Sequence, residues 1–408
     1  MSLYIKKCRN CNSKSMVDLF NLGKIRFTGK FPKYKEKIPH GELNLVMCRS
    51  CKLVQLKHIF NMSYLYNKDY GYRTGINSTM SNHVKSVVKK ISKLAKLKEG
   101  DNVLDIASND GTLLKNYDRG IKTWGIDPIL SKFKKEYKKI NYKISNFFNY
   151  KIILKKKNNV SFKIISALSV FYDLENPNIF LNGIKKLLHK DGLFYLEFQD
   201  LMKIIKHNMF DTICHEHLEY YSVTFINKLL KKHKLRIFDH SYNDINGGSS
   251  AYLICHMNSK YKTKKNRINK ILLNEKNFGI EKVSTYKNFK KRIDLLRKKL
   301  NSNIQKIVDN KKIIHGYAAS TKGNVLLQYY NLDNNKIKFI SDRNPNKRNL
   351  YTPGSNIRII SEAESRNLKP DFYLVLAWHF KKEILLREKK IRNKGTKFIF
   401  PLPNIQII

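Results

Sequence analysis

The chain has 408 residues, of which 42% are hydrophobic and 12% aromatic, and it carries a formal net charge of +48 at pH 7. This length exceeds that of one hydrophobic core and the apolar content excludes wholesale disorder, so we expect two or three folded domains. The charge suits nucleic acid or an anionic membrane, but lysines recur in nearly every segment instead of gathering in one basic arm. A solvated lysine surface is the simpler interpretation, and it favours anionic ligands in general.

The N-terminal sequence MSLYIKKCRNC has no apolar core of signal-peptide length, and no later stretch is apolar for long enough to cross a bilayer. We therefore expect a cytoplasmic protein without membrane insertion. Six cysteines are too few for a disulfide scaffold in a chain of this length. Two of them, Cys214 and Cys255, are expected to pack as small buried groups.

The other four cysteines form two CxxC pairs, Cys8 with Cys11 and Cys48 with Cys51. Each pair can place two thiolates on one turn, and two such turns complete a tetrahedral four-thiolate site, as in structural zinc sites. All four positions would be filled by sulfur, so none is left for a catalytic water. The spacing therefore favours structural zinc over redox chemistry, free thiols or a catalytic metal.

A helical apolar pattern from Asn77 to Lys98 precedes a segment in which strands and helices alternate. Expected strands lie at 102–107, 123–128, 141–147, 162–168 and 192–198, with a helix at 177–188. Such alternation predicts a parallel sheet with helices on both faces. After a polar, lysine-rich stretch with a helical pattern, the alternation resumes. We therefore divide the chain into residues 1–65, residues 66–258, a helical connector at 259–310, and a second α/β unit at 311–408.

The strand-turn-helix VLDIASNDGTLL puts Asp105 at the end of a strand and Gly111 at the start of a short helix. Ala107 and Asn109 stand where the dinucleotide fingerprint has glycines, which argues against NAD. The next strand ends at Asp127, whose carboxylate can accept hydrogen bonds from ribose hydroxyls. Two acids on neighbouring strand ends indicate an adenosyl cofactor without phosphates, so S-adenosylmethionine (SAM) fits better than a dinucleotide. The alternative is that both aspartates only cap local turns.

The segment DTICHEHLEYYS, residues 211–222, gathers two histidines, two glutamates, a cysteine and two tyrosines. Such a segment is compatible with a metal site, with proton transfer or with a polar connecting loop. Histidines two residues apart converge on one ion only in a strand, and no third ligand is evident nearby, so a metal is disfavoured. With a cofactor site upstream, proton transfer by a histidine is the preferred hypothesis.

In the last unit, Lys322 and Asn324 lie at a predicted helix N-terminus, where they can grip a phosphate, although the Walker spacing is absent. Asp342 in ISDRNP is placed like a ribose-binding acid or a turn cap. The NGGS sequence contains Asn246 and Gly248, which are predicted to form a tight turn and to line a sugar pocket.

The sequence resembles the family of SAM-dependent nucleotide-sugar C-methyltransferases, whose members methylate a carbon of a nucleotide-linked 4-keto-6-deoxy sugar. The resemblance covers essentially the whole chain and rests on several motifs in order: the two CxxC pairs, YGYRTGIN, VLDIASNDGTLL, FDTICHEHLEYYS, NDINGGS, and GYAASTKGNVLLQYY followed by SDRNP. It implies an α/β protein, with a class I SAM-methyltransferase Rossmann-like domain between a zinc-binding module and a C-terminal Rossmann-like domain that helps to hold the nucleotide sugar. It also implies SAM as cofactor, Zn2+ as structural metal, and a role in deoxysugar and polysaccharide biosynthesis.

The resemblance further implies the residues of the site. The implied cofactor contacts are Asp105, Asn109, Gly111, Asp127 and an aromatic ring beside the adenine, Phe147 or Phe148. His217 is implied as the base, with Glu216 and His215 beside it. Relatives commonly carry a tyrosine at the position of Cys214, so another donor must polarise the sugar ketone. The candidates are Tyr220, Tyr221, Tyr70 and Tyr72.

A carbon attacks a sulfonium methyl only after it has become an enolate, so a base must remove a proton next to the ketone. A carboxylate such as Glu216 can fix the tautomer of a histidine base, and donors must face the developing oxyanion. Two other functions stay open: an RNA methyltransferase whose zinc module and basic surface grip RNA, and a non-enzymatic zinc-ribbon protein that binds nucleic acid. The resemblance favours a nucleotide-linked keto-deoxy sugar, not nucleic acid, as the partner.

Overall fold

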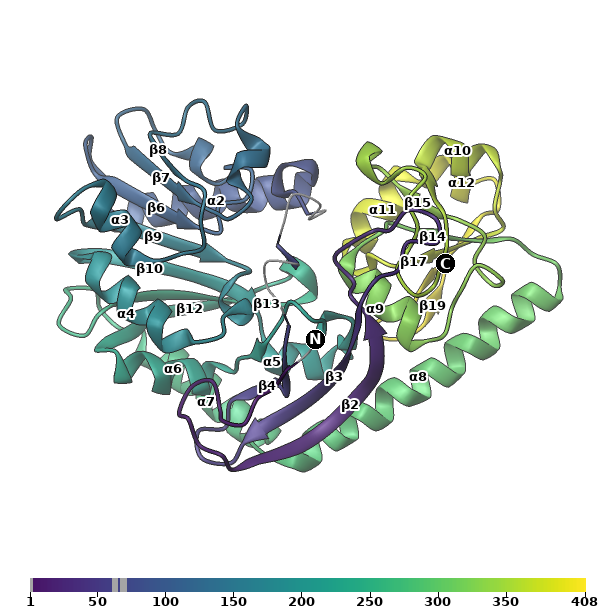
Figure 1. The fold of residues 1–408 in the computed structure, drawn as a ribbon, viewed down its shortest axis with the longest axis horizontal. Helices are drawn as coiled ribbons and strands as arrows, with labels where there is room; N and C mark the ends of the chain where they lie inside the picture. Colours follow the sequence, from purple (N-terminus) through teal and green to yellow (C-terminus); the bar gives the residue numbers. More distant parts are fainter. Residues whose placement is uncertain (1–2, 61–64, 67–71) are drawn as a thin grey trace.

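The computed structural model describes residues 3–60, 65–66 and 72–408, so Tyr70 lies outside the described residues. The described chain forms a central sheet and a C-terminal sheet that stand next to each other (Figure 1). An N-terminal hairpin and the long helix α8 (Val283–Asp309) run along the lower edge of both. This arrangement places three units around one shared region.

The central sheet has seven strands in the order β12-β13-β10-β9-β6-β7-β8. The five strands from β10 to β8 are parallel, whereas β13 is antiparallel to β10 and to β12. The strands are β6 (Asn102–Ile106), β7 (Lys122–Ile126), β8 (Tyr142–Ile144), β9 (Phe162–Leu168), β10 (Leu188–Gln199), β12 (Leu235–Asn243) and β13 (Ser249–His256). The parallel sheet predicted from the sequence is confirmed. Its strand order reverses between β6 and β9, which opens a crevice at the carboxyl ends of these strands.

Helices cover both faces of this sheet. Helix α2 (Ser78–Ala95) buries Val84, Val88 and Ile91 in the apolar cluster on one face. Helix α4 (Pro177–Leu187) packs in the cluster on the other face. The remaining helices of this part are α3 (Tyr150–Lys156), α5 (Leu201–Lys206) and α6 (Val223–Lys232). Helix α2 ends shortly before Lys98, where the helical pattern of the sequence ends, because Lys96 adopts the left-handed conformation with φ 51°.

The N-terminal sheet is built on the hairpin of β2 (Met16–Arg26) and β3 (His40–Cys48). Its order is β11-β4-β3-β2, with β4 at Val54–Leu56 and β11 at Glu219–Tyr220. The strands β1 (Leu3–Tyr4) and β5 (His58–Ile59) form a separate pair. One edge strand of the N-terminal sheet thus comes from the histidine-rich segment 211–222.

The C-terminal unit is a six-stranded sheet in the order β16-β15-β14-β17-β18-β19, parallel except for β19. Its strands are β14 (Ile314–Tyr317), β15 (Ile340–Asp342), β16 (Ile359–Ser361), β17 (Phe372–Val375), β18 (Lys397–Phe400) and β19 (Gln406–Ile407). Its helices are α9 (Thr321–Tyr329), α10 (Glu362–Asn367), α11 (Lys381–Arg387) and α12 (Lys389–Arg392). Helices α7 (Lys265–Phe278) and α8 lead from the central sheet to this unit.

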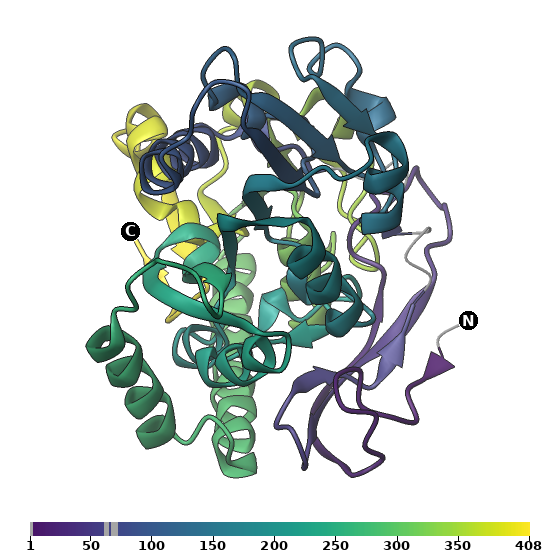
Figure 2. The ribbon, with the colours of Figure 1, turned by 90° about the vertical axis from the view of Figure 1, so that its left-hand side faces the viewer.

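The hairpin ties the C-terminal unit to the rest of the protein. Asn324 Nδ2 donates to the carbonyl oxygen of Thr28 at 2.8 Å, and Arg26 N donates to Gln328 Oε1 at 2.8 Å. One apolar cluster continues from the N-terminal sheet through α8 into the C-terminal unit. Figure 2 shows the hairpin along one side of the central sheet. Because the bond from Asn324 and this apolar cluster are buried, the units hold fixed positions relative to the crevice.

The protein is therefore an α/β protein with a mainly parallel central sheet, an N-terminal sheet and a second α/β unit. Among the helices of the described ranges, none combines the length and apolar character that a bilayer crossing requires.

Candidate active site

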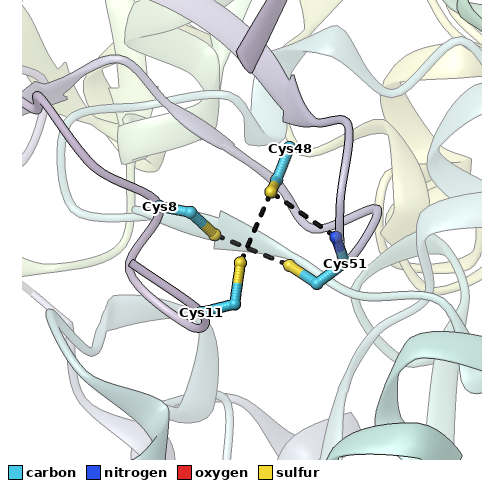
Figure 3. A group of neighbouring side chains, drawn as sticks. All are labelled: Cys8, Cys11, Cys48 and Cys51. Carbon is cyan, nitrogen blue, oxygen red and sulfur yellow. Dashed lines mark hydrogen bonds between the residues drawn. The ribbon is translucent and has the colours of Figure 1, made fainter. Parts of the chain in front are cut away.

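The four N-terminal cysteines converge at one point, as predicted (Figure 3). Their Sγ atoms all lie within 4.8 Å of one another, and the Cys8–Cys51 and Cys11–Cys48 sulfur pairs are each 3.6 Å apart. Lys52, which follows the second pair, adopts a left-handed φ of 64° that closes its turn. Four thiolates on two turns fit tetrahedral Zn2+, for which sulfur is a preferred ligand. The site is structural, because the four sulfurs complete the coordination.

The zinc site is connected to the rest of the N-terminal sheet through two buried side chains. Gln55 Nε2 donates to Cys8 Sγ at 3.3 Å, and Gln55 Oε1 accepts from Arg9 N at 3.2 Å. The Arg9 guanidinium donates to the carbonyl oxygens of Leu56 at 2.6 Å and His58 at 2.7 Å. The metal site therefore fixes β4, on which β11 is paired.

Replacing Cys11 with Ser removes one of the four thiolates. We expect the zinc content to fall from about one ion per chain to well below half, because a neutral hydroxyl is a poor zinc ligand. Zinc is measured by atomic emission on the purified protein. Cys255→Ser, which changes a buried cysteine of the central sheet outside the cluster, is the matched control. Equal zinc content in both variants would contradict this assignment.

A cavity of about 410 Å3 opens at the carboxyl ends of β6 and β7. Asp105, Asn109 and Asp127 line it, together with Phe147 and Phe148, so the structure brings five of the six predicted cofactor residues together. Its volume is typical of small-molecule sites. Both aspartates are almost fully buried. A crevice at the reversal of strand order, closed by two acids, fits an adenosyl group with a ribose.

The turn after β6 adopts an unusual backbone conformation. Ala107, Asn109 and Gly111 have left-handed φ angles of 57°, 48° and 70°. Asn109 N donates to Asp127 Oδ2 at 2.9 Å, and Ile129 N donates to Asp127 Oδ1 at 2.8 Å, so the acid fixes this turn. Gly111 does not line the cavity, and a Cβ there would lie 3.2 Å from the ring of Tyr137.

The short helix predicted to begin at Gly111, after this turn, is a single 3-10 turn, Leu114–Asn116. A helix dipole therefore does not contribute to the cavity, and the turn and the two acids shape it instead. Burial raises the pKa of Asp105 to about 7, and the nearby Asp127 carboxylate adds a smaller increase. The hydrogen bond that Ser166 Oγ donates to Asp105 at 2.6 Å opposes this rise. Phe148 packs against Phe180 with ring centroids 4.9 Å apart, whereas Phe147 is partly exposed at the cavity.

Asp127→Asn should weaken binding of S-adenosylhomocysteine by about tenfold or more, because a charge-assisted acceptor for hydroxyl groups becomes a neutral one, a loss of at least ~1.4 kcal/mol. Binding is measured by calorimetry. Asp118→Asn, at an exposed acid of the same domain, is the control. Equal affinity in both variants would exclude Asp127 as a cofactor contact.

His217 is half-buried in the segment between the 3-10 turn Phe210–Thr212 and β11. Its Nδ1 lies 2.7 Å from the carbonyl oxygen of Thr212, so Nδ1–H donates there and the lone pair of the neutral ring is on Nε2. The ring of Tyr172 lies against it, with centroids 4.2 Å apart. Burial, helped by the Lys322 ammonium, lowers the pKa of His217 to about 3. The ring is therefore held in the form that can accept a proton.

Glu216 and His215 do not take the places expected beside this base. His215 is fully buried between the rings of Phe27 and Phe60, and its Nε2 lies 3.3 Å from the carbonyl oxygen of Gly41. The Glu216 carboxylate is buried against Gly29, where a Cβ would lie 2.4 Å from its Oε1. The group that sets the tautomer of His217 is the Thr212 carbonyl, and the expectation that Glu216 does so is wrong.

Tyr221 also does not take the place expected for a donor to the sugar ketone. It is fully buried in the core of the central domain, and its hydroxyl donates to Glu219 and, at 3.4 Å, to the carbonyl oxygen of Phe171. Tyr220 is buried on the N-terminal side, and its hydroxyl has no hydrogen-bond partner in the described part of the chain. Tyr72, by contrast, lines the cofactor cavity and a second cavity.

This second cavity, of about 200 Å3, lies between Tyr72, the N-terminal hairpin and the C-terminal unit. Its charged lining residues are Arg73, Arg343, Lys347, Arg387, Asp342, Glu362 and Glu383. Asp342 lines it but also caps the local turns, because it accepts from Ala319 N at 2.7 Å and from Asn344 N at 2.8 Å. Both alternatives considered for Asp342 are thus compatible with its position.

Lys322 and Asn324 do not line this cavity. Asn324 is fully buried and bonded to Thr28, so it joins two units and does not grip a phosphate. The Lys322 side chain lies outside this cavity as well, and its Nζ donates to the carbonyl oxygen of Asn246 at 2.9 Å. Asn246 has φ 55° and Gly248 φ 140°, as the predicted tight turn requires. Gly248 packs against Lys203, where a Cβ would lie 3.1 Å from the Lys203 Cβ.

His217 lines neither of these two cavities, but its neighbours connect it to both. Tyr172, which contacts the ring, directly precedes Asp173, and Asp173 lines the cofactor cavity. Lys322, which acts on the ring electrostatically, directly follows Thr321, and Thr321 lines the second cavity. The sequence predicted neither Tyr172 nor Lys322 as a neighbour of His217, because no local pattern shows which residues far apart in the chain come into contact. The ring is thus linked to one cavity through Tyr172 and to the other through Lys322.

Comparisons with known proteins match each part of the chain. Three family models match in succession, described as a zinc binding domain (residues 8–66), a methyltransferase domain (76–240) and a C-methyltransferase C-terminal domain (244–403). The C-methyltransferase NovU of Streptomyces niveus is 28% identical over 99% of this chain and 97% of its own length.

Solved structures are similar to part of the chain. A SAM-dependent methyltransferase from Clostridium acetobutylicum is 14% identical, with a TM-score of 0.36 over 43% of this chain and 92% of its own. The magnesium protoporphyrin IX methyltransferase of Synechocystis with bound SAH is 14% identical, with a TM-score of 0.33 over 44% and 88% of the two chains.

The protein is a SAM-dependent methyltransferase with a structural zinc site. More specifically, the three domain matches and the similarity to a C-methyltransferase over nearly the whole chain make it a C-methyltransferase.

Proposed function

We propose that this C-methyltransferase methylates a carbon next to the ketone of a nucleotide-linked 4-keto-6-deoxy sugar, and that His217 removes the proton that makes this carbon an enolate. The observation that supports the proposal is a neutral imidazole whose neighbours Tyr172 and Lys322 each adjoin, along the chain, a residue that lines one of the two cavities. One ligand on each side of a base is the arrangement that a two-substrate carbon methylation requires.

The second cavity is suited to the nucleotide part. Its arginines and lysine favour a diphosphate, and Asp342 at the end of β15 can accept from ribose hydroxyls. Tyr72, which lines both cavities, would contact the sugar where the two meet. With the nucleotide held there, the sugar extends toward His217.

The reaction is then a proton transfer followed by a methyl transfer. His217 Nε2 accepts the proton from the sugar carbon, and the electron pair of the broken C–H bond moves onto the ketone oxygen. SAM bound in the first cavity supplies an electrophilic methyl group on sulfur. Transfer of this methyl to the enolate carbon would break the S–CH3 bond, leave S-adenosylhomocysteine and re-form the ketone, and the imidazolium of His217 would pass its proton to solvent. The Thr212 carbonyl keeps the accepting nitrogen turned toward the substrate and stabilises the imidazolium.

The base role is tested by deuterium exchange into a 4-keto-6-deoxy sugar nucleotide in D2O without SAM, which isolates proton removal. His217→Ala should slow exchange by about 100-fold or more, the usual contribution of a general base, while the affinity for S-adenosylhomocysteine stays unchanged. His256→Gln, at the opposite end of the central sheet, is the control and should exchange like the wild type. Exchange at the wild-type rate in His217→Ala, or methyl transfer to RNA and never to a sugar, would refute the proposal.

A further inference from the structure

Lys322 of the C-terminal unit lies beside the proposed base, and its role is not explained by phosphate binding. We propose that the Lys322 ammonium donates a hydrogen bond to the ketone oxygen of the substrate and stabilises the oxyanion that forms when His217 removes the proton. This inference rests on the proposed function and adds the electrophilic half of the reaction. It makes the C-terminal unit a part of the catalytic centre.

A chain of hydrogen bonds holds Lys322 and His217 at the same edge of the central sheet. His217 Nδ1 is bonded to the Thr212 carbonyl oxygen, and the Thr212 hydroxyl donates to Gln199 Oε1. Gln199 is the last residue of β10, and its Nε2 donates at 2.8 Å to the carbonyl oxygen of Asn246. Lys322 Nζ donates to that same oxygen at 2.9 Å. Base and ammonium are thus positioned by one network that begins at a buried strand.

The ammonium retains capacity for a further ligand. The ammonium has three N–H donors. Within the described structure one of them is bonded to the carbonyl oxygen of Asn246, so two remain available. Asn246 also reaches the cofactor side, where its Nδ2 lies 3.4 Å from Ser169 Oγ, and Ser169 lines the SAM cavity. A ketone oxygen between the two cavities lies within the region that this ammonium faces.

The charges around Lys322 support this role. Four titratable groups interact electrostatically with Lys322. Asp211 and Cys214 raise the pKa of Lys322, and Lys322 lowers the pKa values of His217 and His379. Burial lowers the pKa of Lys322, and Asp211 opposes that shift. Asp211 is fully buried and accepts from Trp378 Nε1 at 2.8 Å, so a fixed carboxylate compensates the ammonium. A buried, oriented cation stabilises a developing oxyanion far more than one in water.

The same position predicts a signature in the pH dependence. Burial is the main cause of the low pKa of His217 and the Lys322 ammonium adds to it, so removing the ammonium should raise that pKa. The base would then become protonated at higher pH. The acid limb of the exchange rate, which in the wild type lies well below pH 6.5, should move upward in a Lys322 variant. A residue with only a structural role would not shift this limb.

The test compares Lys322→Met, Lys322→Arg and the control Lys397→Met, an exposed lysine at the start of β18. All are measured by deuterium exchange into the 4-keto sugar nucleotide from pH 3 to 8, with zinc content and S-adenosylhomocysteine affinity as checks of folding. We expect exchange to fall at least 100-fold in Lys322→Met with its acid limb shifted upward, and by less than tenfold in Lys322→Arg, which keeps the charge. Lys397→Met should behave like the wild type.

Should Lys322→Met not fold, Lys322→Ala is assayed with added ethylammonium, which should restore exchange in proportion to its concentration. Exchange in folded Lys322→Met within threefold of the wild type, with an unmoved acid limb, would overturn the assignment of Lys322 while leaving His217 as base. Loss without rescue in Lys322→Ala would do the same. Absence of exchange in the wild type and in Lys397→Met would instead overturn the proposed function, and the assignment of Lys322 with it.

Discussion

The site depends on a two-residue strand. In β11, Glu219 pairs with Gln55 and Tyr220 with Val54, and this ladder is extended by the bond from Leu56 N to the carbonyl oxygen of Leu218 at 2.9 Å. Leu218 N in turn donates to the carbonyl oxygen of Tyr172 at 2.8 Å. His217, one residue before these bonds, is thereby fixed between the N-terminal sheet and the central sheet. A slip of the ladder by one residue would turn every following side chain to the other face.

The other two units meet the same segment. Trp378 of the C-terminal unit is bonded to Asp211 at its beginning, and Lys322 reaches the network that holds Thr212. His215 is inserted between Phe27 and Phe60 of the N-terminal part. The segment 211–222 is therefore the place where the zinc module, the methyltransferase sheet and the C-terminal unit contact one another. Under the proposed function, this contact combines the methyltransferase sheet with two further units at the residue that would remove the proton from the acceptor carbon.

Much of this organisation was predictable from the sequence. The CxxC spacing predicts the thiolate cluster, and alternation of apolar segments predicts the parallel sheet, because both depend on residues close together in the chain. Asp105 and Asp127 follow from the rule that parallel strands end at one edge. The roles of Glu216, Tyr221, Lys322 and Asn324 were not predictable. Each depends on a partner far away in sequence, such as Thr28 for Asn324 and Asn246 for Lys322, and only packing decides which way a polar side chain points.

We conclude that the zinc module holds His217, the proposed base, in place through β4 and β11. Amide hydrogen exchange of the whole chain, before and after zinc is removed by a chelator, tests it most directly. We predict that zinc removal accelerates exchange in both β4 and residues 211–220, while β6 and β7 at the cofactor cavity keep their protection. Faster exchange in β4 alone, with residues 211–220 as protected as in the zinc-loaded protein, would contradict the account.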